Sequence, residues 1–361
     1  MSLIWYNGGN ILRKMKFIAL MSILACLLIV IPAGFAADNE TALGLNDTGD
    51  VIGADYYFDA NVENDTGNGS YESPYKELTA ERIYDNSTLH LNDGEYDFHY
   101  DNKVINNVSI VGNDPQKTVI SNAYFTVNSS FTLLNVTLKN SVIENQGNFT
   151  AINSQFNESS SHDLGGVINS NNYTYFDNCT FADNFAQYGG AIHISKGILI
   201  IKNSQFINNE AEFFGGAIIS LNSTLNINNV TFRDNKARFD GGSIYCLDGI
   251  ISLVNSSFIN NSGKNGGALL VDVSRSTFLE SNKFINNTAS DCAGAFSLMY
   301  NDNITINSNY YEIIRQMNIV MTMFPTFSRF SLGTIIIRCL STGIFPPKTF
   351  QIIIVLLMKI A

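Results

Sequence analysis

The sequence is poor in positive charge. Its 361 residues include 21 Lys and Arg against 32 Asp and Glu. The deficit is concentrated in residues 37–310, where 13 basic residues face 31 acidic ones. A strongly acidic body repels the phosphates of nucleic acids and anionic lipids, so we expect no nucleic-acid partner. Such a body is typical of a solvated extracellular surface.

Metal-binding and disulfide patterns are also missing. The four histidines are scattered, and the cysteines form no CxxC pair. We therefore expect no zinc or other metal site and no cofactor. The repeat described below places the cysteines in different columns, so we expect no disulfide among Cys179, Cys246 and Cys292. Cys179 and Cys246 are expected to fill the core as small apolar side chains. The five cysteines are Cys26, Cys179, Cys246, Cys292 and Cys339.

No transmembrane span is expected in the mature chain. The apolar run of residues 17–31 has about 15 residues, whereas a helix needs about 20 to cross a bilayer. Three basic residues precede this run, and the small residues Gly34 and Ala36 follow it. This arrangement is typical of a secretory signal, which predicts cleavage after Ala36. We therefore expect residues 1–36 to be a signal peptide, residues 37–54 a flexible lead, and the protein to be secreted or on the cell surface.

The sequence repeats with a period of 25–26 residues. A phenylalanine marks each copy, and an asparagine follows it by three residues in the last five copies. A glycine pair, replaced by Ala293-Gly294 in the last copy, comes next. Around each phenylalanine apolar and polar residues alternate, which predicts strands. The phenylalanines are Phe156, Phe181, Phe206, Phe232, Phe258 and Phe284; the asparagines are Asn184, Asn209, Asn235, Asn261 and Asn287; the second glycines are Gly190, Gly216, Gly242, Gly267 and Gly294.

Stacking such copies predicts an all-β, right-handed parallel β-helix of about 25–26 residues per coil. The phenylalanines would then stack in the interior. The asparagines would occupy turns, where Asn tolerates left-handed backbone and its amide can bond to neighbouring coils. We expect the β-helix to cover residues 86–310, with clear repeats over 151–310. Residues 55–85 would form an N-terminal cap containing a short helix, with Tyr75, Leu78 and Ile83 on its apolar face.

The repeat resembles a known family pattern. FxxN and GGA[IL] at this spacing resemble the polymorphic outer-membrane-protein repeat, and they look equally like adhesin-like surface proteins of methanogenic archaea. Tyr56–Ala60, Gly67–Ser70 and Leu89–Tyr96 resemble the opening segment of many pectin-lyase-like β-helices. The resemblance covers about residues 55–310. It implies export and surface display, with carbohydrate or a neighbouring cell surface as the ligand, and it does not fix an activity.

We expect no catalysis, but a polysaccharide lyase or glycosidase is the alternative, because such enzymes share this fold. Asp183 and Asp234 occupy one column two coils apart, about 9.6 Å by strand spacing, which would suit an inverting pair. The copy between them carries Asn208, so the column is interpreted as turn polarity. His193 alternates with two isoleucines and is expected to face solvent. No catalytic residue is assigned.

Residues 311–361 differ from the rest of the chain. Asparagine almost disappears, the charge changes sign and the period is lost. A frameshift near Tyr310 would produce such an apolar tail. A further alternative is therefore that the chain is a degenerate, truncated copy without a function.

Overall fold

The computed structural model describes residues 53–313, 320–323, 329–332, 335–339 and 355–357. The chain divides into two compact units, residues 1–50 and 51–361, and the description concerns the second. The expected signal peptide and nearly all of the expected flexible lead lie outside the described residues. Among those residues, no helix is long and apolar enough to cross a membrane.

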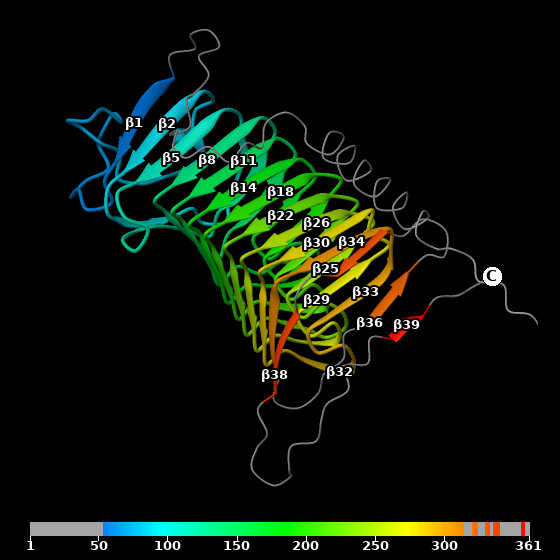
Figure 1. Cartoon of the computed structure of the whole chain (residues 1–361). Helices are drawn as coiled ribbons and strands as arrows, with labels where there is room; N and C mark the ends of the chain where they lie inside the picture. The colour runs from blue at the N-terminus through cyan, green and yellow to red at the C-terminus, as the bar shows by residue number, and fades with distance from the viewer. Residues whose placement is uncertain (1–52, 314–319, 324–328, 333–334, 340–354, 358–361) are drawn as a thin grey trace, which may run out of the picture. The chain divides into compact units, whose positions relative to one another are not determined.

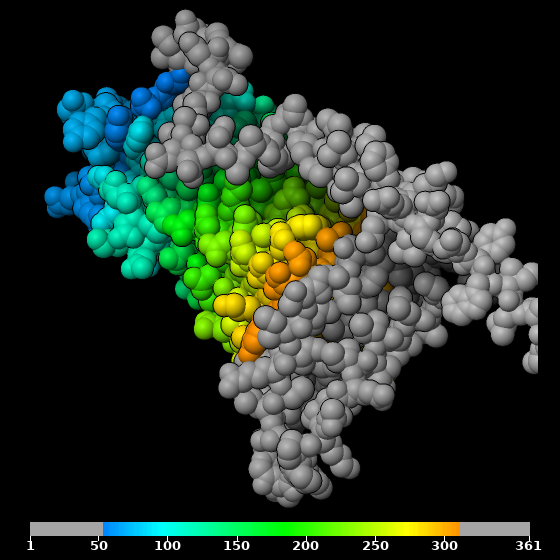
Figure 2. All heavy atoms as spheres, viewed as in Figure 1, coloured from blue at the N-terminus to red at the C-terminus, as the bar shows by residue number. Residues whose placement is uncertain are grey.

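The described chain is a right-handed parallel β-helix, so the predicted fold class is confirmed. Each coil adds one strand to each of three long sheets, and the coils follow one another along one axis (Figure 1). Neighbouring strands are parallel and equivalent residues of successive copies are paired, as in Phe181 with Phe206 and Phe206 with Phe232. In Figure 2 the coils lie against one another as successive colour bands.

Two of the long sheets are called sheet I and sheet II. Sheet I contains, in order, β1 (Ala54–Phe58), β2 (Ser87–Leu91), β5 (Val108–Gly112), β8 (Ser130–Leu134), β11 (Asn148–Ile152), β14 (Tyr173–Asp177), β18 (Ile198–Lys202), β22 (Thr224–Asn228), β26 (Ile250–Val254), β30 (Ser276–Glu280), β34 (Asn303–Asn307) and β37 (Arg329–Leu332). Sheet II contains β3 (Gly94–Asp97), β6 (Thr118–Ser121), β9 (Thr137–Lys139), β12 (Gln155–Asn157), β15 (Thr180–Ala182), β19 (Gln205–Ile207), β23 (Thr231–Arg233), β27 (Ser257–Ile259), β31 (Lys283–Ile285), β35 (Asn309–Ile313) and β38 (Ile335–Cys339).

Sheet III is the third long sheet, and the short sheet IV lies between sheets II and III along the chain. Sheet III contains β4 (Asn102–Ile105), β7 (Tyr124–Val127), β10 (Val142–Asn145), β13 (Ile168–Ser170), β17 (Ile192–Ser195), β21 (Ile218–Leu221), β25 (Ile244–Leu247), β29 (Leu269–Asp272), β33 (Phe296–Asn301), β36 (Val320–Met323) and β39 (Val355–Leu357). Sheet IV contains β16 (Phe185–Tyr188), β20 (Glu210–Phe214), β24 (Lys236–Ala237), β28 (Ser262–Asn265) and β32 (Thr288–Cys292).

The core is built on the predicted phenylalanine column. Rings from Phe156 to Phe284 lie nearly parallel in the interior, with centroids of adjacent rings 4.4–5.0 Å apart. Each ring is at most 1% exposed. Full burial of one such side chain stabilises the folded chain by roughly 1.5–3 kcal/mol, so the column makes a large contribution to the hydrophobic stabilisation of the fold. Cys179 and Cys246 are buried in the same core, as expected, and both are unpaired.

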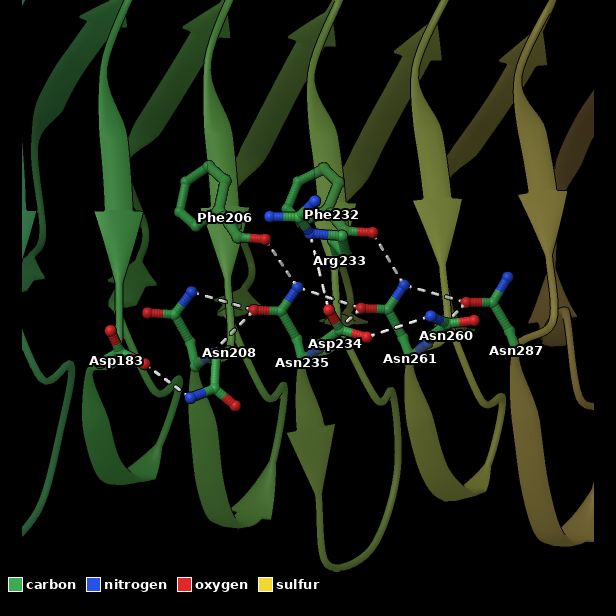
Figure 3. Close-up of polar contacts among 11 residues, drawn as sticks. Asp183, Phe206, Asn208, Phe232, Arg233, Asp234, Asn235, Asn260, Asn261 and Asn287 are labelled. Carbon is green, nitrogen blue, oxygen red and sulfur yellow. Dashed lines mark hydrogen bonds and ion pairs between the residues drawn. The ribbon is translucent and has the colours of Figure 1, made fainter.

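The repeat asparagines form a buried ladder (Figure 3). Nδ2 of Asn235 donates to the carbonyl of Phe206 at 3.0 Å and to Oδ1 of Asn261 at 3.0 Å. The backbone N–H of Asn235 also donates to that Oδ1, at 2.9 Å. The bonding between coils that we predicted is confirmed. The left-handed backbone lies one residue earlier, at Asp234 and its equivalents, and not at the ladder asparagines.

The glycine pairs make the corner that leads into sheet III. The first glycine is left-handed, with φ of 65° at Gly215 and 66° at Gly241, and Ala293 adopts the same conformation in the last copy. The second glycine lies against the next coil. A Cβ atom at Gly216 would overlap the carbonyl oxygen of Gly242. Glycine is therefore favoured at the first position by the left-handed backbone and at the second by the close approach of the next coil.

The prediction of a short helix with an apolar face in the N-terminal cap is wrong. The only helical part of the cap is a single 3-10 turn, η1 (Ala80–Arg82). Tyr75 instead forms a β-bridge with Phe58, and Arg82 forms an ion pair with Asp65 at 2.7 Å. Leu78 and Ile83 are nevertheless buried in the first coils, because an irregular segment can bring apolar side chains to the sheet without a helical face. Strand β1, inside the expected cap, already belongs to sheet I.

Beyond Tyr310 the backbone continues the coil. Strands β36 and β39 extend sheet III, β37 extends sheet I and β38 extends sheet II. These pairings concern strand positions only. Whether the segment 311–361 is native to the repeat protein stays a prediction.

Candidate functional site

The two carboxylates of the glycosidase alternative lie in the turn between sheets II and IV (Figure 3). Asp183 and Asp234 both have φ of 58°, the conformation that Asn208 and Asn260 also adopt in this column. Oδ1 of Asp183 accepts a hydrogen bond from Asn208 at 2.6 Å, and Oδ1 of Asp234 accepts one from Asn260 at 3.2 Å. Asn208 therefore lies between the two carboxylates, and each is bound to the coil that follows it.

His193 does not face solvent as expected, although its side chain leaves the outer face of sheet III. It is 5% exposed. The glycine-pair segments, which follow sheet IV, lie over the outward row of sheet III. A Cβ atom at Gly165 would come within 2.9 Å of the backbone nitrogen of His193, and one at Gly189 within 2.9 Å of the Ile219 side chain. Strand alternation predicts the direction of a side chain but not whether another segment covers it.

Around His193 the outward row of sheet III carries a polar cluster. Glu144, Asn169 and His193 occupy equivalent positions in three successive coils. Asn169 donates through Nδ2 to Oε2 of Glu144 at 2.7 Å, and its Oδ1 lies 2.8 Å from Nδ1 of His193. With the amide oriented in this way, Nδ1 of His193 is the donor and its Nε2 is an acceptor.

Burial shifts the pKa of both titratable ends of the cluster. It lowers the pKa of His193 to about 4, although the nearby Asp163 carboxylate opposes the shift. Burial also raises the pKa of Glu144, and Asp163 adds to that shift. The cluster therefore holds a neutral imidazole on one side of Asn169 and, on the other, a carboxyl group that takes up a proton more readily than usual. Across the described ranges, no group of three or more His, Cys, Asp or Glu side chains is placed to hold a metal ion.

Next to this cluster lie five half-buried aromatic side chains, which we call the aromatic strip. Tyr188 and Phe213 have centroids 5.1 Å apart, and Phe213 and Phe239 lie nearly parallel at 6.0 Å. Phe214 stacks on Tyr245 at 5.1 Å. The strip therefore crosses three successive coils along the axis of the β-helix. Its members are Tyr188, Phe213, Phe214, Phe239 and Tyr245.

The strip is bordered by charges and by the polar cluster. Arg238 lies over the ring of Phe239, with its guanidinium carbon 5.7 Å from the centroid. Burial, together with the Asp272 and Asp240 carboxylates, raises the pKa of Tyr245 to about 12, so its hydroxyl stays protonated. At the other end, the carbonyl of Asp163 accepts a hydrogen bond from the Tyr188 N–H at 3.1 Å. The acidic and aromatic parts thus belong to one surface.

Sequence reasoning missed both the strip and the polar cluster. A signal for the strip was present, because Tyr188 and Phe214 directly precede their glycine pairs and only Asp240 separates Phe239 from its pair. Aromatic residues recurring at the same place before an obligatory corner must share one face of the solenoid. For the cluster, Glu144, Asn169 and His193 are separated by 25 and 24 residues, which is the coil period.

The comparisons with known proteins give a distant structural similarity. No protein-family model matches the sequence, and no curated protein matches it. A solved structure, the native GH136 lacto-N-biosidase from Eubacterium ramulus, is similar over 79% of this chain and 68% of that chain, with 11% identity and a TM-score of 0.42. A similarity at this level carries no argument about the ligand or activity of this chain.

One expectation is nevertheless corrected. We expected the chain not to be an enzyme, and this expectation is wrong as stated, since a solved structure with a similar fold is that of a glycoside hydrolase. The absence of a recognisable catalytic motif in a sequence is a weak basis for excluding catalysis, because residues such as Glu144 and His193 come to lie on either side of Asn169 only after the chain has folded. The adhesin-like resemblance, which no family model supports, rests on the repeat residues alone.

Proposed function

We propose that this protein is an exported surface protein that binds an extended polysaccharide along the aromatic strip. The observation that carries the proposal is the row of half-buried rings on successive coils. Flat aromatic faces pack against the C–H faces of pyranose rings, and aromatic residues commonly dominate the energetics of binding surfaces. Export and surface display are supported by the basic–apolar–small pattern of residues 1–36.

The spacing of the strip supports a chain-like ligand. Successive coils are about 4.8 Å apart, which is close to the length of one sugar unit in an extended β-linked polysaccharide. Rings on consecutive coils can therefore meet consecutive sugars. The protonated Tyr245 hydroxyl and the Asp240 carboxylate provide a donor and an acceptor for sugar hydroxyl groups at the edge of the rings. An adhesive role follows if the polysaccharide belongs to another cell or to a matrix.

The test compares binding of the full chain and its variants to immobilised polysaccharides. The double variant Phe213→Ala/Phe239→Ala should weaken binding roughly tenfold or more, because each ring removed takes away a hot-spot contact. Phe278→Ala is the matched control, since Phe278 is a half-buried ring on the outer face of sheet I, away from the strip. Equal binding by the double variant and the wild type would refute the strip as the binding surface.

A second candidate function is hydrolysis of the bound glycan, and the polar cluster favours it. A glycosidase needs a carboxylic acid with a raised pKa and a second carboxylate. Glu144 has the raised pKa, and Asp163 is the carboxylate that acts on it electrostatically. The same binding experiment tests for hydrolysis if the soluble fraction is analysed for oligosaccharides released from the immobilised polysaccharide. Release by the wild type that Glu144→Gln abolishes would establish hydrolysis, and unchanged release by Glu144→Gln would exclude Glu144 as its acid.

A further inference from the structure

A groove lies over the first coils of sheet II, on a different face of the solenoid from the aromatic strip. It has a volume of about 400 Å³ and lies on the outer faces of strands β3, β6, β9 and β12. Pro115 and Gln116, from the loop before β6, form part of its lining. The hydroxyl of Thr137 donates to the carbonyl of Pro115 and fastens this loop to the sheet. A volume of this size falls within the usual range of small-ligand sites.

The lining contains a polar atom that the fold does not satisfy. Oδ1 of Asn157 is buried and has no hydrogen-bond partner within the described part of the chain. The same side chain donates through Nδ2 to Oε1 of Gln155 at 3.4 Å. An acceptor left in this way costs about 1–3 kcal/mol, and a ligand donor would recover this energy once the Asn157 side chain turns Oδ1 from its buried position toward the groove.

The column of Asn157 holds both polar and apolar residues, with Lys139 in the preceding coil and Arg233 three coils later. In the register of sheet II the position of Asn157 is occupied by Ala182 in the next coil and by Ile207 in the coil after that. The fold therefore accepts an apolar side chain at this place, and the solenoid does not require the amide. An unsatisfied acceptor that is dispensable for the fold, located in a groove, points to a ligand.

The charges of the groove define the kind of ligand. Nζ of Lys139 is already paired with Oε2 of Glu158 at 3.2 Å, and Glu95 adds a further carboxylate. The lining is thus net negative by one charge, which disfavours anionic ligands. An extended peptide could add only to β3, the first strand of sheet II, because β6, β9 and β12 are paired on both sides. Pro115 and Val119 supply apolar surface for the C–H face of a ring.

We propose that this groove binds a neutral sugar, with one sugar hydroxyl donating to Oδ1 of Asn157. The site is separate from the aromatic strip and does not depend on its function. Together the two sites would let one molecule hold a short sugar unit and a longer glycan at the same time. Two weak contacts of this kind give an overall avidity that exceeds either affinity.

The experiment measures binding of cellobiose, lactose and chitobiose to the full chain by ligand-observed NMR, with digalacturonate as the anionic probe. At least one neutral disaccharide should bind, and Asn157→Ala should weaken that binding roughly tenfold, through loss of one hydrogen bond in a desolvated site. Alanine is already present at this position in the next coil, so the variant should fold. Asn157→Asp keeps the acceptor and should retain most of the binding.

Two controls separate this site from the strip. Gln205→Leu changes an outward side chain of the same sheet outside the groove and should bind as the wild type does. The double variant Phe213→Ala/Phe239→Ala should also leave disaccharide binding in the groove unchanged. The proposal is overturned if no neutral disaccharide binds, if digalacturonate binds in preference to all of them, or if Asn157→Ala binds them as well as the wild type.

Discussion

At the scale of single residues, asparagine has two separate roles in this solenoid. Asn178, Asn203 and Asn229 adopt left-handed backbone at the turn between sheets I and II, with φ between 48° and 56°. Asn184, Asn209 and Asn235 are buried and use the whole amide group to bond to neighbouring coils. The first role depends on backbone sterics and would tolerate Gly or Asp. The second depends on two donors and an acceptor in one plane, which only the amide supplies in this space.

Burial of His193 should make the stability of the fold depend on pH, because it lowers the pKa of this residue from 6.5 to about 4. The unfolded chain therefore binds a proton between these two pH values that the folded chain does not. Above about pH 6.5 this group should not reduce the free energy of unfolding. As the pH is lowered toward 4, the free energy of unfolding should fall by up to about 3 kcal/mol because of this group. Glu144 has the opposite effect, since its raised pKa favours the folded state at low pH.

The measurement is the melting temperature of the wild type and of His193→Gln between pH 7 and pH 4. Glutamine can still donate to Asn169 but does not titrate. The difference in stability between the two proteins should shift in favour of the variant as the pH falls through 6.5. Parallel curves would show that the imidazole is protonated as easily in the folded chain as in the unfolded one.

At the scale of elements, the corner before sheet III is the tightest part of each coil. The first glycine of the pair supplies the left-handed turn, and the second allows the carbonyl of the next coil to approach. Ala293 shows that the first position can accept a methyl group at some conformational cost. No such replacement occurs at the second position in the six copies, from Gly166 to Gly294.

Gly216→Ala should therefore destabilise the β-helix by more than about 1 kcal/mol, because its Cβ would overlap the backbone of the next coil. Gly263→Ala is the matched control. Its Cβ would meet the nearest atom, the backbone nitrogen of Gly242, at 3.1 Å, and Ala237 and Ala289 occupy its column in the adjacent copies. Urea unfolding of both variants gives the comparison. Similar losses in the two variants would mean that the close approach at Gly216 is relieved by a shift between coils.

The repeated elements of the fold could be predicted from the sequence far better than the non-repeated ones. The period, the phenylalanine stack and the asparagine ladder could be predicted, because residues that recur every 25–26 positions must be neighbours in a parallel stack. The cap could not, because residues 59–85 are held by single contacts such as Arg82 with Asp65, which have no period. The polar cluster was not predicted, because the alternation of apolar and polar residues in a strand indicates which way the His193 side chain points but not which segment covers it. The strip was missed because its aromatic residues recur before the glycine pairs without keeping one fixed spacing from them.

At the scale of the whole molecule, we predict that the segment beyond Tyr310 results from a frameshift. Its loss of asparagine and change of charge coincide at one point in the sequence. We expect the coding DNA, read in another frame downstream of codon 310, to continue with Asn- and Gly-rich residues or a recognisable cap. Sequencing and translation in the other two frames provide the check. If neither frame continues the pattern, residues 311–361 are a genuine part of the protein.

The inter-coil hydrogen bonds of all four sheets run along the axis of the solenoid, and this has a mechanical consequence. A force applied between the two ends of the described chain would act on all coil boundaries in series, and the boundaries would give way one after another. Each released coil of about 25 residues would add roughly 85 Å of extended chain. Because the copies are nearly equal in length and in their ladder bonds, the releases would be nearly equal steps. A molecule of this build can lengthen under load while the remaining coils, and any glycan bound to them, stay intact.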